Sequence, residues 1–148
     1  MNLALKYGLL ITLVVVVWVL VTHLLVPLAP ESQANVLAPI LFNLAAIVAI
    51  YLGIKSRTDE TTGITFKEGI KTGLGISLVY AISTSLFFFI LFLIVGPTLM
   101  ANEPLAPNYP VWKVALGAFA GMFLGSLILG LVYSTIVSFF LAKRTRTV

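Results

Sequence analysis

The sequence has no cysteine, a single histidine and only five acidic residues among its 148 positions. Without cysteine there is no disulfide framework, no catalytic thiolate and no metal site built on sulfur. Charged residues make up 9 per cent of the chain, whereas a typical soluble domain carries roughly 25 per cent. Because 60 per cent of the residues are hydrophobic, the chain has too little polar material to cover a surface that faces water. A soluble globular fold is therefore excluded.

Four long apolar runs account for most of the chain, at about residues 7–26, 39–55, 68–95 and 113–141. A membrane-spanning helix needs about 20 largely apolar residues. In hydrocarbon every backbone donor and acceptor must be satisfied within the structure, so only helices or closed barrels can span. Barrel strands would alternate in polarity, and the stretch LVVVVWVLV does not. We predict an all-α membrane protein, a four-helix transmembrane bundle forming a single domain over residues 1–148, with a short cytoplasmic loop and two short outer loops.

Two local signals mark helix boundaries. Pro39 stands at the start of the second run, where a first-turn proline is tolerated. In the middle loop, Thr65 and Glu68 have the spacing of a capping box, in which each side chain bonds the backbone N–H of the other residue. This box predicts that the third helix begins near Phe66 and runs for about 30 residues, or roughly 45 Å.

The distribution of basic residues predicts the orientation, because cytoplasmic loops are rich in Lys and Arg. Lys113 is alone on one side, and the other eight basic residues lie on the other side, in the two tails and the middle loop. We therefore expect both termini to be cytoplasmic in a bacterial inner membrane. Residues predicted to contact lipid headgroups are Lys55, Arg57, Lys143, Arg144 and Arg146.

The first apolar run is also followed by a small-x-small site at Ser32–Ala34, as a signal peptidase needs. The run is about 18 residues long, which exceeds the usual hydrophobic segment of a signal peptide. We therefore expect the first helix to be retained as a membrane anchor rather than cleaved after Ala34.

Small residues recur at every fourth position in the third and fourth runs. Such rows let helices approach closely in lipid, where the hydrophobic effect does not drive association. Two interpretations stay open: packing within one chain, or a homodimer. With a packing role, Gly121→Leu is expected to lower thermal stability. The predicted helix-packing residues are Gly69, Gly73, Ser77, Ala81 and Ser85 in the third run, and Gly117, Gly121 and Gly125 in the fourth.

Uncharged polar side chains are the only polar groups deep inside the spans. Asn43, Thr84, Ser134 and Ser138 suggest a polar path for a small solute. We favour the simpler explanation, which is hydrogen bonding between helices or to the preceding turn. No ionised residue lies at mid-span, where proton relays and ion pathways would place one. At the outer face, His23 with Glu31 or Glu103 would be the only acid–base or metal-binding combination. We predict no catalytic site, no cofactor and no metal, and no nucleic-acid partner.

Several segments together resemble a known family. They are LKYGLLI near the start, YLGIKSR at the end of the second run, GITFKEGIKTG before the third, and the glycine- and serine-containing last run ending in Ala142-Lys143-Arg144. This combination resembles the domain of unknown function 4199 family, four-span inner-membrane proteins found mainly in Bacteroidota. That family commonly has a longer, more charged segment between spans three and four, where this chain has a short Pro-rich loop. The resemblance implies four spans and a cytoplasmic-membrane location, and it brings no activity, cofactor or catalytic residue.

The absence of ionised groups at mid-span, beside strong packing rows, favours a non-enzymatic role. We expect an accessory, scaffold or lipid-organising membrane component. Its expected partners are membrane lipids and a second copy or a larger membrane complex. The alternative is a small oligomeric channel or a passive transporter of a small solute.

Overall fold

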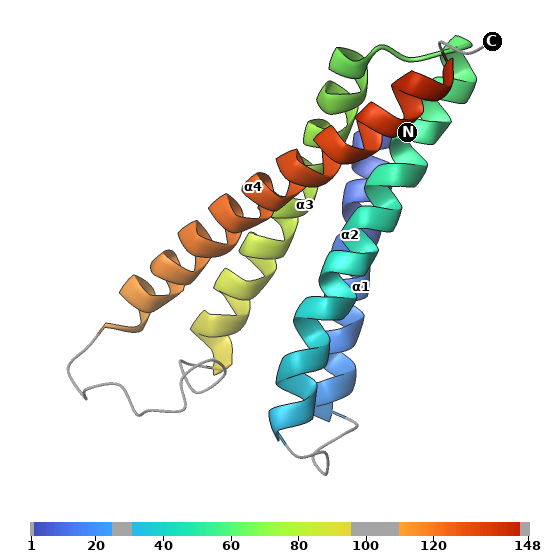
Figure 1. Ribbon diagram of the computed structural model, residues 1–148. Helices are drawn as coiled ribbons and strands as arrows, with labels where there is room; N and C mark the ends of the chain where they lie inside the picture. The colour runs from blue at the N-terminus through green and yellow to red at the C-terminus, as the bar shows by residue number, and fades with distance from the viewer. Residues whose placement is uncertain (1, 25–30, 96–109, 146–148) are drawn as a thin grey trace.

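Four α-helices make up the computed structural model (Figure 1). The structure describes residues 2–24, 31–95 and 110–145, with side chains for residues 2–22, 37–94 and 110–142. Within these ranges there is no strand, and the predicted all-α, four-helix fold is confirmed. The helices are α1 (Leu3–Leu24), α2 (Glu31–Thr61), α3 (Phe66–Val95) and α4 (Val111–Thr145).

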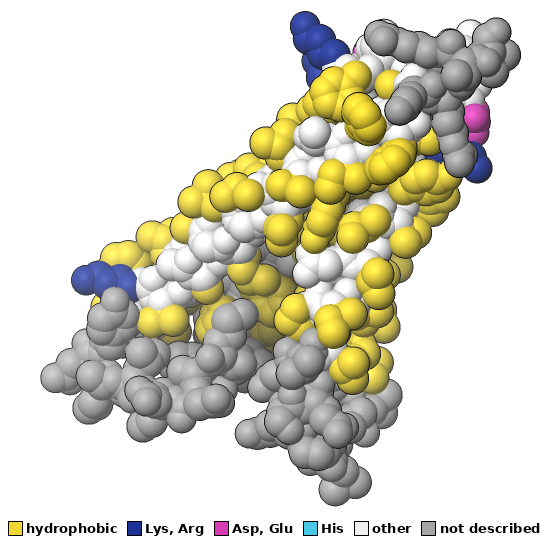
Figure 2. Space-filling model, viewed as in Figure 1, with side chains coloured by type: hydrophobic (Ala, Val, Ile, Leu, Met, Phe, Trp, Pro, Cys, Tyr) yellow, Lys and Arg dark blue, Asp and Glu magenta, His cyan; other side chains and the backbone are white. Residues whose placement is uncertain are grey.

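Every helix contains a segment long and apolar enough to cross a membrane, at residues 3–22, 37–61, 66–94 and 111–142. Large hydrophobic side chains cover the visible outer surface, and the basic side chains stand at the ends of this apolar body (Figure 2). A helix that is hydrophobic on all sides belongs in a large core or in a membrane. A chain of 148 residues has no such large core, so the protein is a multi-pass membrane protein.

The second helix begins earlier than its apolar run. We expected Pro39 in the first turn of a helix, and this was wrong, because α2 begins at Glu31 and Pro39 lies inside it. Composition shows where the apolar run starts, whereas a helix can continue into the polar residues beyond the hydrocarbon. An internal proline is tolerated in membrane helices when other groups satisfy the backbone that it disturbs.

The charged stretch after the second run is also largely helical, since α2 continues to Thr61. Thr62 then adopts a left-handed conformation with φ of 56°, and the N–H of Gly63 donates to the carbonyl of Thr58 at 3.1 Å. This is the hydrogen bond that closes a Schellman motif at a helix C-terminus. The connection to α3 is therefore only a few residues long.

The predicted capping box at the start of α3 is confirmed. The N–H of Glu68 donates to the Thr65 hydroxyl at 3.3 Å, and the N–H of Thr65 donates to the Glu68 carboxylate at 3.0 Å. Both bonds satisfy backbone donors that a helix N-terminus would otherwise leave unpaired. The helix begins at Phe66 and is 30 residues long, as predicted.

Thr65→Ala is expected to loosen the first turn of α3. An N-cap substitution of this kind costs about 1 kcal/mol, which corresponds to about fivefold faster amide exchange. The measurement is hydrogen exchange at the Glu68 amide by NMR. Thr72→Ala is the control, because the Thr72 hydroxyl bonds a carbonyl of its own helix and caps nothing. Unchanged exchange at Glu68 would show that the box does not hold the helix start.

The helices form two pairs that separate toward one end of the molecule. In Figure 1, α1 lies beside α2 and α3 beside α4, and the pairs converge near the two termini and the α2–α3 turn. Helices α1 and α3 run parallel, since Ala4 faces Gly75 and the Thr12 hydroxyl lies 2.6 Å from that of Ser83. Both termini and the middle connection therefore lie at one end of the protein.

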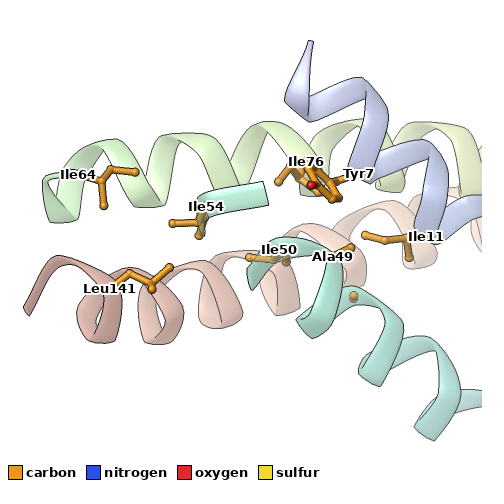
Figure 3. Packing of buried hydrophobic residues seen from close by; sticks show 9 residues of the cluster. Tyr7, Ile11, Ala49, Ile50, Ile54, Ile64, Ile76 and Leu141 are labelled. Carbon is orange, nitrogen blue, oxygen red and sulfur yellow. The ribbon is translucent and has the colours of Figure 1, made fainter. Parts of the chain in front are cut away.

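The main hydrophobic core lies at this closed end (Figure 3). Ile54 and Ile76 are fully buried, and Ile64 from the α2–α3 turn covers the cluster at the end of the bundle. Because all four helices contribute, this core holds the two helix pairs together. Its members are Tyr7 and Ile11 from α1, Ala46, Ala49, Ile50 and Ile54 from α2, Ile64, Ile76 from α3, and Leu141 from α4.

Candidate functional site

The interface between α3 and α4 is built from small residues on both helices. A Cβ added at Gly69 would lie 2.8 Å from the Ser138 Cβ, and one added at Gly73 would lie 2.5 Å from the Ser134 Cβ. One turn farther along, Gly130 of α4 meets Ser77 of α3. Each step of four residues along α3 is thus matched by a step of four back along α4.

This register explains how the predicted rows are used. All five small residues predicted on the third helix are buried: Gly69, Gly73, Ser77, Ala81 and Ser85. Their partners on α4 include Gly130, Ser134 and Ser138. Sequence reasoning missed Gly130 as a packing residue, although its four-residue spacing to Ser134 and Ser138 was a usable signal.

The predicted glycine row on the fourth helix is placed differently. A Cβ added at Gly117, Gly121 or Gly125 would meet nothing within 4 Å. Gly125 lies five residues before Gly130, which puts it about 140° around the helix from the face that meets α3. We expected these three glycines to pack against another helix of the same chain, and this was wrong. Gly121→Leu is therefore not expected to destabilise the monomer.

Large aromatic residues replace the small ones toward the other end of the same helix pair. The rings of Phe89 in α3 and Phe119 in α4 lie edge to face with centroids 6.2 Å apart. Phe119 also stacks on Phe123 at 6.1 Å. Rings of this size hold helix backbones apart, whereas glycine and serine let them touch. The α3–α4 interface thus changes from glycine and serine near the closed end to aromatic rings toward the other end.

A small polar pocket lies between α2, α3 and α4. The Tyr133 hydroxyl donates to the Asn43 side-chain oxygen at 2.6 Å, and the Asn43 amide donates to the Pro39 carbonyl at 2.7 Å. Tyr80 and Ser126 bring two further hydroxyl groups to the same pocket. The pocket has a volume of about 30 Å³, and its polar lining consists of Asn43, Ser77, Tyr80, Ser126 and Tyr133.

The other residues considered for a polar path lie in different interfaces. Thr84 is buried between α1 and α3, where its hydroxyl lies 3.2 Å from that of Thr12. Ser134 and Ser138 are buried against the glycines of α3. In the described part of the chain, Asn43 therefore shares no pocket with Thr84, Ser134 or Ser138, and the four residues do not mark one path.

Two of the predicted headgroup-binding residues are placed at the exposed end of α2. Lys55 and Arg57 are exposed there, and Arg57 lies 3.8 Å from Glu60 in a surface ion pair. Such an exposed pair contributes about 0–1 kcal/mol. The side chains of Lys143 and Arg144, and all of Arg146, lie outside the described residues.

The acid–base combination at the outer face also falls outside the described residues. This applies to the side chains of His23 and Glu31 and to the whole of Glu103. Among the described residues no group of three or more His, Cys, Asp or Glu side chains is placed to hold a metal ion. The polar pocket is thus the candidate site that the described side chains define.

Comparison with known protein families identifies the family to which this chain belongs. The family model described as "Protein of unknown function (DUF4199)" matches residues 6–103. The chain belongs to the DUF4199 family. The matched segment includes nearly all of α1 and the whole of α2 and α3, and it ends before α4 begins at Val111.

The DUF4199 match covers three of the five polar residues that line the pocket. Asn43, Ser77 and Tyr80 lie within the matched residues, whereas Ser126 and Tyr133 lie beyond them. From the sequence we also expected the last helix to resemble the family. The family match ends before that helix and does not test this prediction. No curated protein and no solved structure matches this DUF4199 chain.

Proposed function

We propose that this DUF4199 protein is an accessory or scaffold subunit that joins other membrane helices through the exposed glycine row of α4. The observation that carries the proposal is that a Cβ added at Gly117, Gly121 or Gly125 would meet no other helix of the described chain within 4 Å. The same helix uses equivalent small residues at Gly130 and Ser134 for its close contact with α3. A second copy of the chain or another membrane protein would pack against the free row in the same manner.

The burial of the helices supports this proposal. α4 is the least buried of the four spans, and α3, which lies against it, is the most buried. Exposed apolar residues in lipid carry no hydrophobic penalty, so association there depends on shape and close backbone contact. A free row of glycines offers that contact, whereas the leucines and isoleucines elsewhere on α4 are suited to lipid.

We further propose a bacterial cytoplasmic membrane with both termini on the cytoplasmic side. Lys55 and Arg57 at the end of α2, and Lys67 and Lys71 at the start of α3, lie at the end where the termini meet. The positive-inside rule assigns that end to the cytoplasm. Lys55 and Arg57 are exposed there and are suited to contact anionic headgroups, at about 1 kcal/mol for each basic residue.

The alternative function, a channel or passive transporter, has less support. The described polar pocket holds about 30 Å³, and a cavity needs about 10–15 Å³ to hold a single water. This pocket is therefore too small for a solute. Three of the residues first considered for a path are buried in helix interfaces apart from Asn43. The Thr84 hydroxyl lies 3.2 Å from that of Thr12 in α1, the Ser134 hydroxyl donates to the Gly130 carbonyl of its own helix, and Ser138 packs against Gly69.

The mass of the protein extracted with lipid tests the scaffold proposal. In native nanodiscs or mild detergent, light scattering corrected for the bound lipid or detergent should give a protein mass per particle clearly above that of the 16.0 kDa chain. Gly121→Leu should reduce it to the monomer, because leucine blocks close approach. Ala120→Leu is the matched control, since it places the same leucine side chain at an exposed neighbouring position outside the row. A lone monomer in both media, together with solute flux in liposomes, would favour the transporter.

A further inference from the structure

The pocket between α2, α3 and α4 has unused hydrogen-bonding capacity. The Asn43 amide carries two N–H groups, and the Pro39 carbonyl accepts only one of them. The Asn43 oxygen accepts from Tyr133 and keeps a second lone pair, and the Tyr133 oxygen, which donates its proton, can still accept. In hydrocarbon such unused donors and acceptors are costly unless they find a partner.

The other walls of the pocket supply the complementary groups. Tyr80 and Ser126 both line the pocket, and each hydroxyl can donate one proton and accept a hydrogen bond. Ser77 donates to the Gly73 carbonyl at 2.8 Å and retains its lone pairs. The pocket therefore presents both free donors and free acceptors, contributed by three different helices, and no charged group lines it.

We propose that this pocket is a binding site for one water molecule, which joins α2 to the α3–α4 pair at mid-membrane. A water both donates and accepts, and a buried water typically makes two to four hydrogen bonds. The volume of about 30 Å³ exceeds the roughly 10–15 Å³ that one water requires and is too small for an organic ligand. Anions and cations are excluded because the lining is neutral and the site lies in the apolar region.

Because the pocket lies between three helices, a water in it would connect them. The hydrogen bond from Tyr133 to Asn43 is a direct polar link between α4 and α2. A water held by Asn43 on one side and by Tyr80 or Ser126 on the other extends this link to α3. It therefore stabilises the contact between the two helix pairs beyond the closed hydrophobic core.

Water-edited solid-state NMR on the full chain in bilayers tests the proposal. The protein is labelled with ¹⁵N-asparagine, and the Asn43 side-chain signal is assigned by its loss in Asn43→Leu. We expect water magnetisation to reach the Asn43 amide as efficiently as it does amides at the membrane surface. The double variant Tyr80→Phe, Ser126→Ala removes two partners of the water and should reduce this transfer at least threefold.

Two further variants keep the result interpretable. Ser126→Ala alone is the milder change if the double variant is unstable, and it should give an intermediate loss. Thr135→Val is the matched control, because the Thr135 hydroxyl bonds the Leu131 carbonyl and lies outside the pocket. No transfer to Asn43 in the wild type would overturn the site. Transfer that is unchanged in the double variant would overturn it as well, because water would then reach Asn43 without these partners.

Discussion

Gly73→Leu is expected to destabilise the fold by about 2 kcal/mol or more. Even a Cβ at this position would lie 2.5 Å from the Ser134 Cβ and close to Ile54, and leucine adds three further carbons. Overpacking of this kind costs about 1–3 kcal/mol and occasionally more. Replacing a helical glycine recovers about 1 kcal/mol of helix propensity. The steric cost is larger, because both backbones would have to move apart at their closest contact.

The matched control for this prediction is Gly121→Leu. It makes the same chemical change in a helix where an added Cβ meets nothing within 4 Å. Thermal unfolding should be followed at a protein concentration where both variants run at the monomer mass. We expect the melting temperature of Gly73→Leu to fall by about 5–10 °C and that of Gly121→Leu to stay near the wild type. Equal shifts in the two variants would refute the assigned α3–α4 register.

Ile76→Ala is expected to produce the second large effect. Ile76 is fully buried in the core at the closed end, and its Cδ1 fills the space above Gly53 of α2. Truncating a buried isoleucine to alanine costs about 2–5 kcal/mol, because atoms lose their contacts and the cavity collapses only partly. Since the cluster joins all four helices, this loss should weaken the junction of the two helix pairs.

Leu78→Ala provides the control on the same helix. Leu78 is 44 per cent exposed, and in lipid its side chain is replaced by equally apolar acyl chains, so little free energy is lost. Ile76→Val should fall between the two, with a cost of about 0.5–1.5 kcal/mol. Unfolding in a denaturing detergent titration measures the series. A loss for Leu78→Ala as large as that for Ile76→Ala would contradict the assigned core.

Local chemistry made some features predictable from the residues. The capping box at Thr65 and Glu68 depends on two side chains and the backbone between them, and it was predicted correctly. The start of α2 was predicted wrongly, since the helix extends through polar residues before Pro39. An apolar run reports the preference of side chains for hydrocarbon, whereas helix formation depends on backbone hydrogen bonds that continue beyond it.

The candidate site illustrates the limit of such reasoning. Asn43 and Tyr133 were both visible as polar residues within spans, yet they are 90 positions apart and their hydrogen bond depends on how α2 meets α4. Likewise, the glycines at 121 and 73 belong to rows of identical spacing. One is packed against a serine and the other has no neighbour, and spacing alone cannot distinguish these two environments.

The amino-acid sequence by itself determined the class of this protein. Too few charges and four long apolar runs leave a helical membrane fold as the only way to satisfy the backbone, since that constraint acts within each segment. The tertiary structure decided which glycine row is used in the chain, and it brought Asn43, Tyr80 and Tyr133 to one pocket. These choices depend on the rotation and crossing of each helix against its neighbours. Those are set by the summed contacts of many residues rather than by any local pattern.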